Sequence, residues 1–121
     1  METLIRHILF MSLKQQMKFY IDKDGYCSVD ADEENRLVEW FLKDDIQGCL
    51  HTANEYIAAC NSVENGQNPK WEGTGNAHTV TIKPDGVEIF NEYTEESLQI
   101  ATIEEFKGYL ERWKELLLSR E

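Results

Sequence analysis

Residues 78–100 have the sequence HTVTIKPDGVEIFNEYTEESLQI and carry the clearest structural pattern in the chain. Apolar and polar side chains alternate along residues 78–83, which is typical of a strand with one buried face. Pro84-Asp85-Gly86 is a turn sequence, and residues 87–93 alternate again. Residues 98–100 repeat the alternation after a short polar segment. The pattern predicts a three-stranded antiparallel meander.

An amphipathic helix is predicted after this meander. Thr102 occupies the N-cap position, and Glu104 and Glu105 are close enough to form a capping-box arrangement. Apolar residues then recur at helical spacing in one stripe, which consists of Ile103, Phe106, Leu110, Trp113 and Leu117. We expect the stripe to cover one face of the sheet.

The sequence of the N-terminal half predicts a hairpin followed by a helical segment. Residues 18–29 form two short strands around Lys23-Asp24-Gly25, and Asp30 or Asp32 caps the helix that follows. Helical periodicity runs over residues 37–60, with Gly48 either bending one helix or separating two. Residues 64–76, rich in Gly, Asn and Pro, are expected to form an exposed loop. The fold class is therefore α+β, with residues 17–121 as a single domain.

Residues 1–16 are treated as an N-terminal extension. Leu4, Ile5, Ile8, Leu9 and Leu13 would lie near one face of a short helix. The segment lacks the small-residue cleavage pattern of a secretory signal. Met17 is an alternative start.

The net charge of the chain limits the classes of partner that it can bind. Twelve Lys and Arg against 23 Asp and Glu give a formal net charge of −11. Nucleic acid and anionic membranes are disfavoured as ligands, because both require clustered basic residues. Basic protein surfaces and cations remain as possible partners. The three cysteines, Cys27, Cys49 and Cys60, lack CxxC spacing and are interpreted as reduced core residues of a cytoplasmic protein.

The sequence contains no motif for catalysis or for a cofactor. Asp22, Asp24 and Glu33 match three positions of a calcium-binding loop, but Cys27 stands where that loop needs Gly. His7, His51 and His78 are far apart, and no GxSxG motif or phosphate-binding loop is present. We therefore expect a protein that is not an enzyme and that binds neither metal nor cofactor.

Exposed aromatic residues among carboxylates are the candidate partner-binding residues, because rings bury area with little loss of rotamer freedom and charges steer association. The candidates are Trp71, Glu72, Glu88, Phe90, Glu92, Tyr93, Glu95, Glu96, Asp44 and Asp45. The alternative is that Phe90 and Tyr93 cover the second sheet face against the helical middle, and that the acids only confer solubility.

The run GNAHTVTIKPDGVEIFNEYTEESLQIATIEEFKGYLERWKELL resembles the end of the immunity proteins of bacterial contact-dependent growth inhibition systems. It also resembles a small family of acidic enterobacterial proteins. The shared pattern is two hairpin strands, a third strand with Glu-Glu-Ser-Leu, and Glu-Glu-Phe at the start of an amphipathic helix. The likeness is one of architecture and spacing over about residues 17–118.

The resemblance implies a cytoplasmic protein that binds a cognate toxin domain one to one and neutralises it. Such toxins are commonly nucleases, whose basic groove suits an acidic inhibitor. The resemblance supplies no binding motif that carries over to particular residues. The alternatives are an acidic adaptor or housekeeping protein without a toxin, or a small enzyme in which carboxylates converge with a histidine.

Overall fold

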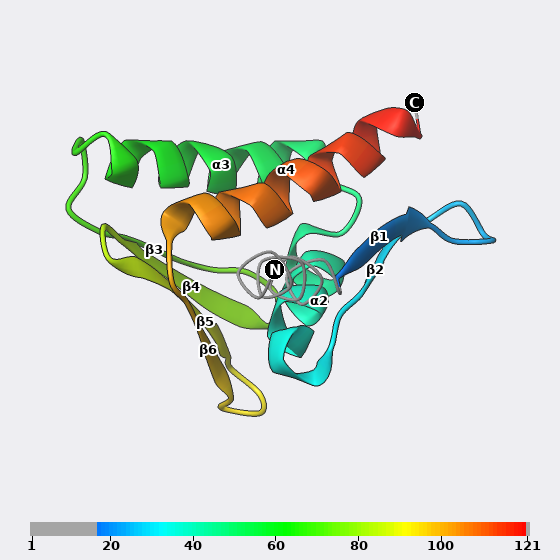
Figure 1. Ribbon diagram of the computed structural model, residues 1–121, viewed down its shortest axis with the longest axis horizontal. Helices are drawn as coiled ribbons and strands as arrows, with labels where there is room; N and C mark the ends of the chain where they lie inside the picture. The colour runs from blue at the N-terminus through cyan, green and yellow to red at the C-terminus, as the bar shows by residue number, and fades with distance from the viewer. Residues whose placement is uncertain (1–16, 121) are drawn as a thin grey trace, which may run out of the picture.

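A four-stranded antiparallel sheet is the largest element of the computed structural model, which describes residues 17–120 (Figure 1). Its strand order is β3-β4-β5-β6. The strands are β3 (Trp71–Thr74), β4 (His78–Lys83), β5 (Gly86–Asn91) and β6 (Ser97–Ile100). The predicted α+β class is confirmed. The predicted meander corresponds to β4 to β6, and β3 is an additional strand.

Strand β3 lies in the segment predicted to be an exposed loop, so that prediction is wrong for these four residues. Trp71 pairs with Ile82 and Thr74 pairs with Thr79 in antiparallel register. The Trp71 ring lies across Gly73, where a Cβ atom would collide with it. The Gly-rich composition is thus compatible with an edge strand, which is held by hydrogen bonds to β4 and not by local propensity.

Two long helices, α3 (Leu50–Glu64) and α4 (Ile103–Ser119), lie side by side over one face of the sheet and run in opposite directions (Figure 1). The Thr102 hydroxyl accepts a hydrogen bond of 3.0 Å from the Glu105 amide, as expected for an N-cap residue. The Glu105 carboxylate accepts from the Tyr109 hydroxyl at 2.7 Å, so the reciprocal bond of a capping box is not formed by it. All five residues of the predicted α4 stripe are buried. They pack against α3 as well as against the sheet.

The predicted helical middle is divided into several segments. Asp32 caps a short 3₁₀ turn, η1 (Glu33–Asn35), which continues into α2 (Arg36–Phe41) and a π-helical turn, η2 (Leu42–Ile46). The chain then breaks before α3, so two helices form instead of one bent helix. The break coincides with Gln47, whose φ is 55°, and not with a left-handed Gly48.

The hairpin consists of β1 (Lys18–Ile21) and β2 (Cys27–Asp30), and it extends from the body of the molecule (Figure 1). Gly25 has a φ of 87°, which a three-residue turn with a glycine bulge requires. The Asp22 carboxylate accepts hydrogen bonds from the amides of Asp24 and Tyr26, both 2.9 Å. This carboxylate therefore has a role in the hairpin turn.

The buried apolar residues of α2, η2, α3, α4, β2, β4, β5 and β6 form one core, and the half-buried Phe19 of β1 and Trp71 of β3 pack against it. Cys60 is buried and Cys27 is half-buried, whereas Cys49 is exposed at the N-cap of α3. The prediction of a core position is therefore wrong for Cys49, because the helix begins only after it. The predicted N-terminal helix lies outside the described residues. Within residues 17–120, no helix combines the length and the apolar content needed to cross a membrane.

Candidate functional site

The outward side of the four-stranded sheet is the candidate site. Its side chains form two rows across the strands, and we call these eight residues the open face: Glu72, Thr81, Glu88 and Gln99 in one row, and Thr74, Thr79, Phe90 and Ser97 in the other. All eight are exposed or half-buried, whereas the alternate residues of β4 and β5 are largely buried. The helices of the described chain pack on the opposite face.

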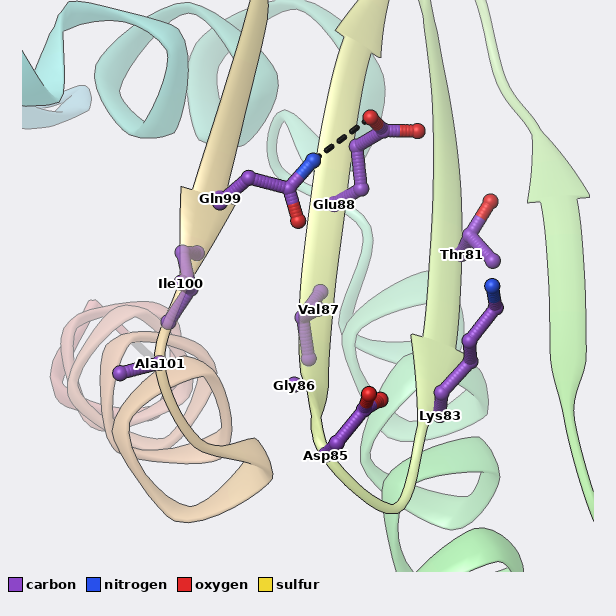
Figure 2. Close-up of a pocket in the computed structure, with 9 residues that line it drawn as sticks. All are labelled: Thr81, Lys83, Asp85, Gly86, Val87, Glu88, Gln99, Ile100 and Ala101. Carbon is purple, nitrogen blue, oxygen red and sulfur yellow. Dashed lines mark hydrogen bonds between the residues drawn. The ribbon is translucent and has the colours of Figure 1, made fainter.

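Hydrogen bonds hold one carboxylate of the open face, Glu88, and one beside it, Glu92, in position. Gln99 Nε2 donates to Glu88 Oε2 at 2.7 Å across β5 and β6 (Figure 2). The Thr79 hydroxyl donates to Glu92, just beyond the end of β5. Thr79 also shares a hydrogen bond of 2.8 Å with the Thr74 hydroxyl. A charged partner would therefore meet side chains that have already lost part of their rotamer freedom.

Phe90 is the aromatic residue of the open face. It lies between Thr79 on β4 and Ser97 on β6, and it is half-buried. Glu88 points to the same side of β5 two residues earlier. The ring does not pack between the sheet and the helical middle, because α2 and α3 lie on the other face. The alternative that Phe90 packs on the second face of the sheet against the helical middle is therefore wrong.

A hollow of about 270 Å³ opens at one end of this face (Figure 2). Its floor lies at Gly86, where a Cβ atom would stand 2.8 Å from the Ile100 carbonyl oxygen. Side chains of Lys83, Asp85 and Glu88 surround it. Both signs of charge are present, so the hollow can receive a polar side chain of a partner.

Other predicted site residues lie beside the open face, near the β5–β6 turn. Tyr93 is 79% exposed, and its hydroxyl donates to the Asn76 carbonyl at 3.5 Å. Asn76 Nδ2 donates to the Asp44 carbonyl at 2.8 Å, so Asp44 and Tyr93 are brought close together. Glu95 is exposed in the same turn.

Glu96 has an intramolecular partner. Its carboxylate forms an ion pair with Arg36 of α2. Arg36 also contacts Glu33 at 3.1 Å. Since this charge is already compensated, Glu96 attracts a basic partner less than Glu92 does. Glu72 is intermediate, because Lys70 Nζ lies 3.6 Å from its carboxylate on the exposed surface.

The sequence suggested that Trp71 is an exposed loop residue, but the structure places it in β3. It points to the covered side of the sheet, where its ring centroid lies 5.3 Å from that of Tyr56 in an edge arrangement. The ring is half-buried against the core. Trp71 therefore belongs mainly to the packing of β3 on α3.

The prediction that Asp45 is an exposed partner-binding residue is also wrong, because its side chain is 0% exposed. Its carboxylate accepts hydrogen bonds from the amides of Ala77 at 3.1 Å and His78 at 3.0 Å. A third contact of 3.2 Å joins it to His78 Nδ1. The residue therefore ties η2 to the start of β4 and is inaccessible to a partner.

The buried network continues from His78 to Asn91. The Asn91 side-chain oxygen accepts from the amides of Tyr93 and Thr94, both 2.9 Å, so its amide nitrogen is the atom that faces His78 Nε2 at 3.1 Å. Nε2 then accepts, and Nδ1 carries the proton donated to Asp45. Both ring nitrogens are occupied and the ring is 0% exposed. The arrangement of Asp45, His78 and Asn91 therefore stabilises loops and is almost entirely buried.

Sequence reasoning missed most polar members of the open face, although the alternation that placed Phe90 also places Thr79, Thr81 and Gln99. It could not find the Asp45 network, whose members are separated by 33 and 13 residues. Across residues 17–120, no group of three or more His, Cys, Asp or Glu side chains could hold a metal ion.

Comparisons of the chain with protein-family models, with curated proteins and with solved structures find no match. The geometry of the open face and the charge of the chain are therefore the basis for a functional proposal.

Proposed function

We propose that this protein binds a basic toxin domain one to one in the cytoplasm and neutralises it, as an immunity protein does. The supporting observation is the open face, where Phe90 lies near Glu88, which is held by Gln99, while Glu92 beside the face is held by Thr79. The net charge of −11 supplies long-range attraction to a basic surface. The C-terminal resemblance to immunity proteins points in the same direction.

The mechanism divides binding between steering and anchoring. Exposed acids such as Glu72 and Glu92 raise the association rate, and salt screens this contribution beyond about 8 Å at physiological ionic strength. Phe90 supplies apolar area at the centre of the face, where water is excluded in a complex. A toxin whose basic groove is covered in this way loses access to its substrate.

The size of the interface indicates which neighbouring residues take part. Four strands span roughly 15 Å by 20 Å, since strands lie about 4.8 Å apart and rise about 3.3 Å per residue. Tight complexes bury about 800 Å² on each partner. The interface must therefore continue beyond the sheet, and the adjoining exposed residues Tyr93, Glu95 and Asp44 are its expected extension.

Binding to the domain encoded next to this gene tests the proposal. Glu88→Lys reverses a charge at the centre of the open face, and Glu111→Lys makes the same change on the exposed side of α4. We expect Glu88→Lys to weaken binding at least tenfold, about 1.4 kcal/mol or more, and Glu111→Lys to change it less than about threefold. Isothermal titration and protection of cells that express the toxin domain give the two readouts.

Two results would contradict the proposal. One is an absence of sub-micromolar binding to the neighbouring domain together with a failure to protect. The other is equal weakening by Glu88→Lys and Glu111→Lys, which would leave net charge as the only determinant. An association rate independent of salt would remove the steering contribution.

A further inference from the structure

A second pocket lies away from the open face, where the hairpin, η2 and the end of α4 meet. Its volume is about 330 Å³. We call it the hairpin pocket, and its lining residues are Tyr26, Cys27, Lys43, Gln47, Gly48, Trp113 and Arg120. None of them belongs to the open face, so a role for this pocket is independent of the proposed function.

The charge of the hairpin pocket is opposite to that of the chain. Among the described residues 17–120, Lys43 and Arg120 line it and no carboxylate does. Lys43 Nζ lies 3.4 Å from the Glu39 carboxylate, a long contact that leaves donor capacity. Within residues 17–120, the acceptor found for the Arg120 guanidinium is the Cys27 sulfur at 3.7 Å. Sulfur is a weak acceptor, and a guanidinium has five N–H donors.

An aromatic ring supplies an exposed apolar surface in the same pocket. Tyr26 is 63% exposed in the hairpin turn. Trp113 also lines the pocket but is only 1% exposed, and its indole N–H donates to the Gln47 carbonyl at 2.8 Å, so it offers the pocket no free donor. A ligand with a flat apolar part can therefore lie against the Tyr26 ring while its charged end meets the cations.

The wall between these groups is rigid although its backbone is strained. Gln47 has a φ of 55°, an uncommon conformation for a residue with a side chain. Its amide donates to the Leu42 carbonyl at 2.8 Å, and its side chain donates to the Asp44 carbonyl at 2.7 Å. Together with the Trp113 bond, these contacts keep the pocket shaped before a ligand arrives.

We propose that the hairpin pocket binds a small organic anion, a carboxylate or phosphate carried on an aromatic ring. Arg120 would bind two of its oxygens in the planar geometry that guanidinium favours, and Lys43 would add a point charge. The acidic remainder of the chain opposes anion binding at long range. At physiological salt that repulsion is screened beyond about 8 Å. Arg120, which forms no ion pair within residues 17–120, then supplies most of the local attraction, because the charge of Lys43 is partly compensated by Glu39.

Phenyl phosphate and inorganic phosphate are the two probes. In ¹⁵N spectra of the whole chain at physiological salt, we expect phenyl phosphate to shift the Trp113 indole signal and the amide signals of Cys27 and Gly48 in a saturable way. Inorganic phosphate should bind at least fivefold more weakly, because it lacks the ring. Arg120→Gln should weaken the binding of phenyl phosphate at least tenfold, and Lys43→Gln should weaken it about threefold.

Lys107→Gln is the matched control, since it removes one cation near the start of α4, at the opposite end of that helix from Arg120, and should change affinity less than about twofold. The proposal is overturned by an absence of saturation up to about 20 mM, a concentration that corresponds to negligible affinity. Equal affinity in the Arg120→Gln and Lys107→Gln proteins also overturns it. Equal binding of the two phosphates would show an adventitious ion only.

Discussion

The two faces of the β3-β4-β5-β6 sheet are built from the same strands but have different environments. On β4, His78, Val80 and Ile82 are 0% exposed, whereas the intervening Thr79 and Thr81 are half-exposed. The covered face excludes water beneath the helices, and the open face keeps its polar groups hydrated or bonded to each other. Neighbouring residues on one strand should therefore affect different properties, stability on one face and binding on the other.

The largest expected effect is on the covered face. Ile89→Ala removes a fully buried side chain from β5 and should lower the free energy of unfolding by about 2–5 kcal/mol, because a cavity remains in the core. Urea denaturation measures this change. If the loss were below about 0.5 kcal/mol, the claim that this face carries the stability would be wrong.

A second prediction concerns the buried polar network at the edge of that face. Asp45→Asn replaces one acceptor oxygen by an amide group that faces a backbone N–H or the His78 ring. Because a donor then meets a donor, we expect the free energy of unfolding to fall by about 1–3 kcal/mol. Asp44→Asn is the matched control one residue away on an exposed side chain, with an expected change within about 0.5 kcal/mol. Equal urea midpoints for the two variants would contradict the structural role of Asp45.

Alkaline pH probes the helix layer over the covered face. Burial, followed by the nearby carboxylates of Asp45 and Glu55, raises the pKa of Tyr56 to about 12. The folded state keeps this proton after the unfolded chain has lost it, so stability is complete below about pH 10 and falls as pH rises toward about 12. The fall should be on the order of 1 kcal/mol from this residue.

Tyr56→Phe isolates that contribution. Burial also raises the pKa of Cys60 to about 12, so the wild-type protein loses stability over this range from more than one group. The variant should lose less stability between pH 10 and pH 12 than the wild type when urea midpoints are compared. Parallel curves for the two proteins would show that Tyr56 does not cause the loss.

The smallest expected effect on stability belongs to the open face. Phe90→Ser changes the residue next to Ile89 and should cost less than about 1 kcal/mol, because the ring is only half-buried. The same variant should weaken toxin binding at least tenfold if the open face is the interface. If the variant unfolded readily, or bound the toxin with unchanged affinity, the claim that one face carries stability and the other carries binding would be wrong.

Local patterns predicted several parts of this fold correctly. Asp24-Gly25 predicted the hairpin turn, and Thr102 predicted the start of α4, because both signals act within a few residues. Period-two alternation placed Phe90 and Glu88 on one face of β5. These features need no information about distant partners.

Two errors have a common physical origin. Trp71 was expected in a loop because Pro, Asn and Gly surround it, yet pairing with β4 makes it part of a strand. Asp45 was expected at the surface because charged residues are rarely buried, yet three hydrogen bonds compensate its carboxylate. In both cases the deciding partner lies far along the chain.

The sequence by itself determined the turns, the caps, the amphipathic stripe of α4 and the division of each strand into two sets of side chains, because steric and hydrophobic periodicity are local. Only the tertiary structure decided which face the helices cover, that β3 joins the sheet and that Asp45, His78 and Asn91 meet. Those outcomes depend on how the apolar surfaces of distant segments fit together, and that fit sets which polar groups are removed from water.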